Sequence, residues 1–135
     1  MPIVRRKWIA RQQLRDKREW LWVFGDNVLE SGLGGQAREM RGEPNAVGIP
    51  TKWAPARTAT SYFTDADYER VYPMIARAFQ TLNQHLMRGG TVVWPEDGVG
   101  TGLSELPERA PAIFAYIKGC EAAMQAVAEA MEDRT

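Results

Sequence analysis

The chain has 135 residues and no net charge, with 44% apolar and 25% charged residues, values that are typical of one globular domain rather than a disordered chain. It contains one cysteine, Cys120, and one histidine, His85, so an internal disulfide and a zinc site built from His and Cys are both excluded by count. The composition therefore predicts a single domain over residues 1–135, without a structural metal.

The start of the chain predicts a cytoplasmic protein. Arg5, Arg6 and Lys7 are basic, but no apolar segment of the signal-peptide type follows them. No apolar run approaches the roughly 20 residues that a membrane-spanning helix needs. A single cysteine also suits a reducing compartment. We therefore expect a cytoplasmic protein without membrane contacts.

Charge is unevenly distributed along the chain. Residues 1–57 carry 11 basic and 6 acidic side chains, whereas residues 58–135 carry 6 basic and 11 acidic ones. Residues 1–19 form a basic N-terminal arm, whose basic side chains are Arg5, Arg6, Lys7, Arg11, Arg15, Lys17 and Arg18. Such an arm could contact a nucleic-acid phosphate backbone. The alternative is an ordinary solvated face.

Short apolar segments alternate with loops in the first half of the chain. Residues 20–24 are continuously apolar and end at a Gly-Asp-Asn sequence, which predicts a buried strand that delivers its carboxyl end to a loop. A glycine-rich stretch, residues 31–35, follows this strand. The next predicted elements are a short helix over 36–41, a strand over 45–49 and a loop over 53–64.

Two helices surround a third strand in the second half. Apolar residues at three- and four-residue steps predict a long helix over residues 65–87. Pro73 interrupts this pattern, so the helix either begins near Tyr72 or kinks at Pro73. The remaining predicted elements are a strand over 91–94 and a helix that begins between Pro107 and Pro111 and ends near Met131.

This order of strands and helices predicts an α/β fold with helices on both faces of the sheet, that is, three α/β/α layers. In open α/β sheets, ligands bind beyond the carboxyl ends of the strands. The loops over residues 25–35 and 95–103 follow two predicted strands, and both are therefore candidate ligand loops.

The loop over residues 97–102 has glycine at every second position, namely Gly98, Gly100 and Gly102. Glycine lets a ligand approach the backbone closely, and successive free N–H groups form a concave anion site. The loop runs toward a predicted helix, whose N-terminus would favour a phosphate. The alternative is a plain turn, which favours the same residue types.

Another glycine-rich loop lies earlier in the chain and contains Gly32, Gly34 and Gly35. In chain order it is the first glycine loop, and residues 97–102 form the second. Two such loops in one small domain suggest a pyrophosphate held between them. Neither loop is followed by Gly-Lys-Ser/Thr, and neither matches the dinucleotide pattern G-x-G-x-x-G. ATP hydrolysis and hydride transfer are therefore disfavoured.

Polar and charged side chains follow the predicted strands. Lys52 could bind a phosphate or, if burial lowers its pKa, act as a nucleophile; the alternative is an exposed surface lysine. Asp26 and Asn27 could hydrogen-bond a ribose hydroxyl, or they could cap a turn. Glu96 and Asp97 offer carboxylates beside the second loop, or are simply solvated.

The tryptophans are expected mostly in the core, and those assigned to it are Trp8, Trp20, Trp22 and Trp94. Trp53 is the exception, because it follows Lys52 in a loop and could stack on a base there. Tyr62 and Phe63 in the same loop could do likewise, although packing is their expected role.

Three segments taken together resemble the macro domain superfamily. They are residues 23–27 with 32–37, residues 48–53, and residues 94–103. Within that superfamily the pattern resembles the branch of ADP-ribosyl glycohydrolases that includes the antitoxin removing ADP-ribose from DNA. It is also similar to a group of small, uncharacterised bacterial and phage proteins. The resemblance covers residues 20–118, and residues 119–135 are expected to end the last helix.

The resemblance implies a macro-like domain with a central mixed sheet and ADP-ribose, or a related nucleotide, in the cleft. Residues 32–37 would be the first ligand loop, and residues 98–103 would surround the diphosphate. Lys52 would attack or stabilise the anomeric carbon of ADP-ribose. No cofactor is implied.

Two positions depart from the family pattern. The branch often has a catalytic Asp just after the Gly-Leu of the second loop, where this chain has Ser104. The nearest carboxylates are Glu105 and Asp97. In addition, the Gly-Asp segment that holds adenine in many macro domains is not evident before residue 20.

These observations lead to three hypotheses: an enzyme that cleaves an ADP-ribosyl linkage on nucleic acid or protein, a binder of an ADP-ribose-derived nucleotide without turnover, and an antitoxin-like interaction protein. The predicted catalytic residues are Lys52, Asp97 and Glu105. The predicted ligand-binding residues are Gly25, Asp26, Asn27, Gly32, Gly34, Gly35, Thr51, Trp53, Gly98, Val99, Gly100, Thr101, Gly102, Leu103 and Ser104.

Overall fold

The structure, a computed structural model, describes residues 2–134. Its strands are β1 (Ile3–Arg6), β2 (Leu21–Asn27), β3 (Ala46–Lys52) and β4 (Val92–Pro95). Its helices are α1 (Arg11–Asp16), α2 (Ala37–Met40), α3 (Tyr68–Met87), α4 (Leu106–Arg109) and α5 (Pro111–Glu132). Two short 3-10 turns, Ala59–Ser61 and Asp65–Asp67, connect β3 to α3.

The strands form one sheet in the order β1-β4-β2-β3, and each neighbouring pair within residues 2–134 runs in parallel. The mixed sheet implied by the family resemblance is therefore wrong for this part of the chain. The physical reason is the connectivity: each strand is followed by a helical crossover rather than a hairpin, and a crossover returns the chain in the same direction. Within residues 2–134 the one antiparallel pairing is an isolated bridge between Lys52 and Tyr62.

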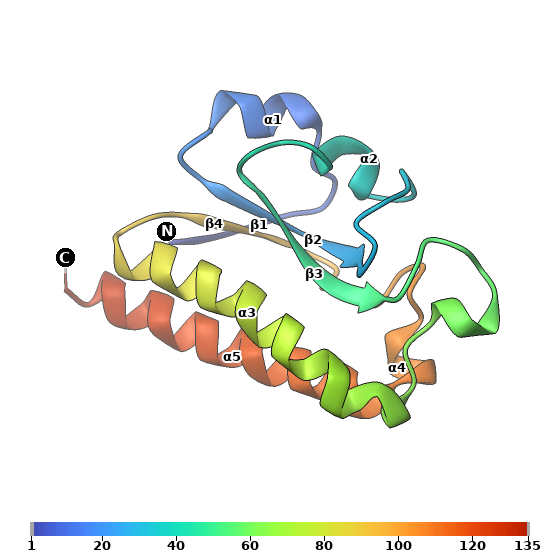
Figure 1. Cartoon of the computed structure of the whole chain (residues 1–135). Coiled ribbons are helices and arrows are strands. Elements are labelled where there is room, and N and C mark those ends of the chain that lie inside the picture. Colours follow the sequence, from blue (N-terminus) through green and yellow to red (C-terminus); the bar gives the residue numbers. More distant parts are fainter. Residues whose placement is uncertain (1, 135) are drawn as a thin grey trace.

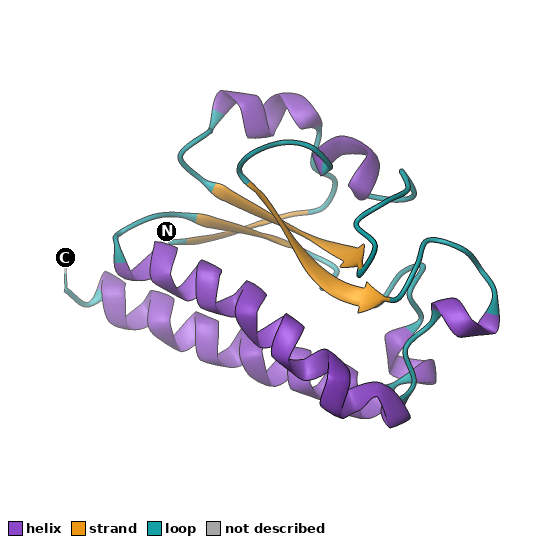
Figure 2. Cartoon of the chain, in the orientation of Figure 1, coloured by secondary structure: helices purple, strands orange, loops and turns teal. Residues whose placement is uncertain are grey.

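Helices cover both faces of the sheet, as the alternation of elements predicts. Figures 1 and 2 show α1 and α2 on one face and the two long helices α3 and α5, side by side and running in the same direction, on the other. The three-layer α/β/α arrangement is thus confirmed, while the finer assignment to a macro-like fold stays a prediction.

Strand β2 is covered on both faces, which explains its continuous apolar sequence. Trp22 and Phe24 pack with α1 and α2 in one core cluster, whereas Val23 packs in the other cluster, with α3 and α5. Successive side chains of a strand point to opposite faces, so a strand covered on both faces needs apolar residues throughout. All three side chains are buried.

Helix α3 begins at Tyr68 and continues through Pro73. A start near Tyr72, one of the two alternatives for Pro73, is therefore wrong. The proline lies within the second turn of the helix, where its missing N–H removes only the hydrogen bond to the carbonyl of Glu69. The buried face of α3 supports the helix across this position, with Val71 and Ile75 fully buried on either side of the proline.

Residues 1–19, treated above as a basic arm, contain two elements of the domain. Strand β1 pairs with β4 at the edge of the sheet, and α1 packs near α2. Leu14 in α1 is fully buried. The described part of this segment is therefore integrated into the fold rather than extended from it.

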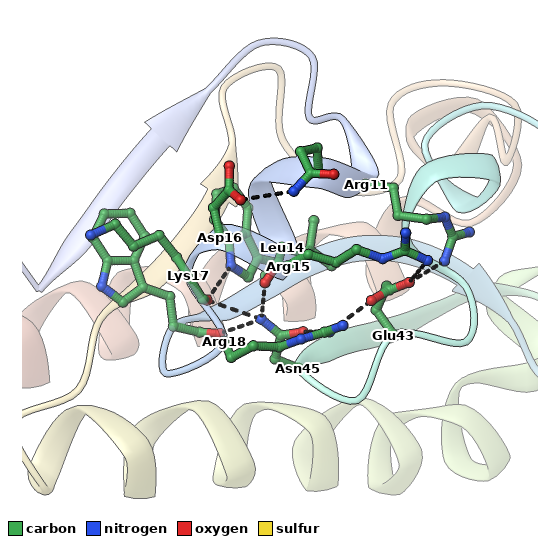
Figure 3. Close-up of polar contacts among 11 residues, drawn as sticks. Arg11, Leu14, Arg15, Asp16, Lys17, Arg18, Glu43 and Asn45 are labelled. Atoms are coloured by element: carbon green, nitrogen blue, oxygen red, sulfur yellow. Dashed lines mark hydrogen bonds and ion pairs between the residues drawn. The ribbon is translucent and has the colours of Figure 1, made fainter.

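Glu43 forms ion pairs with three arginines of this segment. The carboxylate of Glu43, in the turn before β3, accepts from the guanidiniums of Arg11, Arg15 and Arg18, at 2.7 Å in the case of Arg18 (Figure 3). Nearby, Asn45 Nδ2 donates to the carbonyls of Leu14, Lys17 and Trp20. These contacts connect α1 to the chain before β3. With the ion pair between Arg5 and Glu121, four of the seven basic side chains have an acidic partner.

The ion pairs of Glu43 make the free energy of unfolding depend on pH in the acidic range. The hydrogen bonds from Arg11 and Arg18 lower the pKa of the Glu43 carboxyl from 4.5 to about 2. A carboxyl whose pKa is lower in the folded state stabilises that state above its unfolded pKa, and this contribution disappears as pH falls through the folded pKa. We expect Glu43→Gln to lower the free energy of unfolding at neutral pH, and the difference from wild type to shrink as pH falls from about 4.5 to about 2.

Urea unfolding of wild type and Glu43→Gln across that pH range measures this difference. Glu129→Gln, an exposed glutamate on α5, is the matched control and should follow wild type throughout. A constant difference between wild type and Glu43→Gln at every pH would contradict the assignment.

Trp8 differs from its predicted position in the core. It lies in the loop between β1 and α1 and is 55% exposed. The sequence pattern could not place Trp8 correctly, because β1 has only four residues and its alternation ends before residue 8. Trp22 and Trp94 are buried as expected, and Trp20 is partly buried.

No helix within residues 2–134 has the length and apolar character required to cross a membrane.

Candidate functional site

A cavity of about 400 Å³ opens where β2, β3 and β4 end. Its walls come from the last residues of these strands, from the loops after β2 and β4, and from the loop after β1. This is the edge at which parallel α/β sheets bind ligands, and the volume lies in the range of small-molecule pockets. Both glycine-rich loops contribute to one and the same cavity.

The second glycine loop supplies a run of free backbone donors. The N–H groups of residues 99–104 donate to no acceptor within the described part of the chain. Val99, Gly100 and Ser104 are buried, Thr101, Gly102 and Leu103 are exposed, and all six residues line the cavity. Buried N–H groups are nearly always paired in folded proteins, and this run at the cavity wall can donate to water or to an anionic ligand.

The helix expected after this loop contributes less than the sequence suggests. The loop leads into α4, which has four residues, and the longer helix α5 begins only at Pro111. Pro111 disfavours helical geometry at the preceding residue, and Ala110 is extended in φ at −146°. The donors that this loop offers to an anion are therefore its own amides and not a helix terminus.

The first glycine loop is held in place by Arg41 from the end of α2. Its guanidinium forms a two-point ion pair with the Asp26 carboxylate, at 2.6 and 3.1 Å. It also donates to the carbonyls of Ser31 and Gly32. Two-point pairs of this kind are strong and geometrically specific. Arg41 therefore fixes the loop after β2 relative to the end of that strand.

Asp26 and Asn27 take the turn-forming role rather than presenting free groups. Asn27 Nδ2 donates to the Ser31 carbonyl at 2.7 Å, and the Asp26 carboxylate accepts from the Asn27 N–H. Thr51 donates its hydroxyl to the Asp26 carbonyl. All three residues line the cavity, with Gly25 beside them, but their side chains are engaged in shaping it.

The two glycine loops face each other closely. A Cβ placed on Gly34 would lie 3.3 Å from Cδ1 of Leu103, which belongs to the second loop. Gly32, Gly35 and Leu103 also line the cavity. A diphosphate that binds here would contact both loops.

Lys52 is a buried lysine on the cavity wall. Its ammonium donates to the Ala56 carbonyl at 2.9 Å and lies 4.3 Å from the centre of the Tyr62 ring. Burial lowers the pKa of Lys52 below its ordinary value, and the nearby guanidiniums of Arg57 and Arg109 lower it further, while the carboxylate of Glu105 partly offsets them. A lowered pKa increases the fraction of neutral amine, which is the nucleophilic form.

The other predicted catalytic and loop residues fall into two groups. Asp97, Thr101 and Ser104 line the cavity with Gly98 and Gly102. Thr101 also donates its hydroxyl to the Asp97 carbonyl, which stabilises the turn of this loop.

Glu105 and Trp53 lie outside the group of residues that line the cavity. Glu105 precedes α4 with a half-exposed side chain that pairs with Arg109 at 3.5 Å. Trp53 packs edge-on against Phe63 and donates its indole N–H to Asp67. Trp53 therefore anchors the loop after β3, and base stacking by it has no geometric support.

Sequence reasoning missed several residues of the cavity wall. The polar and aromatic wall residues that no sequence prediction assigned to a ligand are Trp8, Phe24 and Arg41. Ser31 and Gln36 lie within the loops predicted to bind the ligand, and Lys7 was predicted only as part of the basic arm. Arg41 could have been suspected as a cation six residues after Gly35 of the first glycine loop. Lys7 and Trp8 belong to the wall through the pairing of β1 with β4.

Within residues 2–134 no group of three or more His, Cys, Asp and Glu side chains is arranged to hold a metal ion.

Comparison with known proteins identifies the family of the chain but not its activity. A search of curated proteins finds no match, and a search of solved structures finds none either. Residues 4–120 match DUF7831, described as a family of unknown function, and this match covers most of the chain. The cavity and both glycine loops lie within the matched residues. The chain therefore belongs to the DUF7831 family.

Proposed function

We propose that this protein binds a nucleotide diphosphate-ribose, such as ADP-ribose, and hydrolyses an ADP-ribosyl linkage on nucleic acid or protein. The observation that carries the proposal is the run of free N–H groups in residues 99–104, which line a cavity of about 400 Å³ together with a second glycine loop. Such a site suits a diphosphate because several donors can surround it without a bound metal.

The charges around the cavity are compatible with an anionic ligand. Three cationic side chains, Lys7, Arg41 and Lys52, line it together with the carboxylates of Asp26 and Asp97. Asp26 is neutralised by its ion pair with Arg41. The charges that remain, on Lys7, Lys52 and Asp97, are positive in sum and favour a phosphate near the amides.

Lys52 supports the catalytic half of the proposal. Its amine attacks the anomeric carbon of the ribose, and the bond between that carbon and the acceptor breaks. A carbon–nitrogen bond forms as the acceptor leaves, and the proton that the attached lysine nitrogen loses passes to the acceptor through Asp97, the available carboxyl on the cavity wall. Water then attacks the anomeric carbon, the carbon–nitrogen bond breaks, and a proton of the water returns to the lysine nitrogen, which releases ADP-ribose and restores the amine.

A binder without turnover is the second candidate. Two observations favour it: Ser104 occupies the position where the family resemblance would place a catalytic Asp, and Glu105 lies outside the cavity wall. Nucleic acid as the acceptor also remains a proposal. Among the basic side chains of the N-terminal segment, Arg6, Lys7 and Lys17 are exposed and have no acidic partner within residues 2–134, so they are available for it.

Calorimetric titration with ADP-ribose tests the binding site, with AMP as the comparison ligand. Gly102→Glu is the blocking variant, because Gly102 has no positive φ and an added Cβ would meet nothing within 4 Å. The new carboxylate would repel the diphosphate and should weaken ADP-ribose binding by more than about a hundredfold.

Gly119→Glu on α5 is the matched control, since a Cβ there also meets no atom within 4 Å. It should bind as wild type does. Wild-type protein that fails to bind ADP-ribose, or Gly102→Glu protein that binds it normally, would refute the proposed site.

A further inference from the structure

Two exposed large apolar side chains, Trp8 and Leu103, line the cavity. Within residues 2–134 the exposed large apolar side chains are Trp8, Leu29, Leu33, Met87 and Leu103. All except Met87, the last residue of α3, lie in the loops that follow β1, β2 and β4. Exposed apolar surface rarely clusters without a role, and it often marks a ligand or partner contact. The rim of this polar cavity therefore suits a ligand with an apolar or aromatic portion.

Trp8 is the largest of these side chains, and its backbone is firmly held. The N–H of Ile9 donates to Gln36 Oε1 at 2.8 Å, and Gln36 Nε2 donates to the Ile9 carbonyl at 2.7 Å. Ile9 itself is fully buried. Gln36 follows Gly35 directly, so this reciprocal pair sets the position of Trp8 relative to the first glycine loop. Trp8 is thus exposed within an anchored segment and lines the cavity.

The neighbours of Trp8 define the chemistry that it could recognise. Lys7 lines the same cavity beside it, and the free amides of residues 99–104 form another part of the wall. An aromatic face next to an anion site matches a nucleotide, which combines a planar base with phosphate. Tryptophan supplies a large stacking surface that tolerates any base, since every base has a π-face.

We propose that Trp8 is a stacking platform for a nucleobase, and that it makes the cavity select nucleotides over simple phosphates. This inference rests on the proposed function, because it assumes that phosphate binds at the loop amides. The base could belong to the nucleotide itself or to a nucleic-acid acceptor attached to it. The stacking chemistry is the same in both cases.

Titration of the intact protein with three probes tests this proposal. The probes are ADP-ribose, inorganic pyrophosphate and a short oligothymidylate, and the proteins are wild type, Trp8→Ala, Trp8→Phe and Met87→Ala. Trp8→Ala should weaken ADP-ribose binding about tenfold or more. It should change pyrophosphate binding by less than about twofold, and Trp8→Phe should retain most of the affinity. Met87→Ala, which removes a side chain of equal exposed fraction (55%), should match wild type.

The outcomes separate this proposal from the proposed function. A loss confined to oligothymidylate supports stacking and identifies nucleic acid as the source of the base. Equal losses for ADP-ribose and pyrophosphate overturn it, as does Trp8→Ala protein that binds ADP-ribose and oligothymidylate normally. If wild type binds neither ADP-ribose nor pyrophosphate, the proposed function fails. The role of Trp8 is then tested by oligothymidylate binding alone. If Trp8→Ala protein binds oligothymidylate as tightly as wild type does, the stacking proposal is wrong.

Discussion

Replacing Lys52 with methionine is expected to reduce the release of ADP-ribose from ADP-ribosylated DNA or protein by about two to four orders of magnitude. Methionine keeps an apolar stem against Tyr62 but lacks the amine that would attack the anomeric carbon. ADP-ribose should still bind, because the loop amides that would hold the diphosphate are unchanged. Turnover assays and calorimetric titration of the same preparation measure the two effects separately.

Lys52→Arg distinguishes attack from electrostatic stabilisation. Arginine retains a positive charge but is a poor nucleophile, since its guanidinium stays protonated. Activity restored by arginine would show that Lys52 acts only through its charge. If Lys52 is the nucleophile, wild-type turnover should rise with pH through the lysine pKa, which burial places below the ordinary value.

Lys118→Met is the control for the loss of a lysine. Lys118 is exposed on α5 and pairs with Glu121, outside the cavity wall. The Lys118→Met protein should turn over substrate at the wild-type rate. Full activity in Lys52→Met would refute the catalytic role of Lys52, and binding without turnover in wild type would establish the non-catalytic binder instead.

Substitution of Gly100 by alanine should destabilise the protein by about 2 kcal/mol or more. Gly100 has a φ of +90°, a conformation that a residue with a Cβ rarely adopts. A Cβ there would also lie 2.6 Å from Cδ1 of Leu106, which is fully buried in the core. Because Leu106 cannot withdraw, the second glycine loop must move, and ADP-ribose binding should weaken as well.

Gly102→Ala provides the matched comparison within the same loop. Gly102 lacks a positive φ, and its Cβ would meet nothing, so its stability should stay within about 0.5 kcal/mol of wild type. Urea unfolding of the two variants measures the contrast. Equal stability of Gly100→Ala and Gly102→Ala would show that the loop is looser than its contacts suggest.

The secondary structure of the central region follows from local sequence patterns. Continuous apolar segments marked β2, β3 and β4, because strands covered on both faces carry no polar alternation. Spacing of apolar residues marked α3 and α5. The same patterns gave the three-layer arrangement, since alternating strands and helices must bury both faces of a sheet.

The N-terminal segment could not be read in the same way. Strand β1 is four residues long and carries two arginines, so it resembles a charged arm until it pairs with β4. Likewise, the basic residues of positions 5–18 left a phosphate-binding surface and an ordinary solvated face as alternatives. The structure pairs three of them with Glu43, a residue 25 or more positions away in the chain.

The sequence by itself determined the α/β class, the two glycine loops and the presence of Lys52 after a strand, because each depends on residues that are neighbours in the chain. Only the tertiary structure decided that the sheet is parallel, that both loops and Lys52 share one cavity, and that Asp26 is paired with Arg41. It also decided that Glu105 and Trp53 lie outside this cavity while Trp8 lines it. These facts depend on strand order and on contacts between distant segments, which no local pattern of residues encodes.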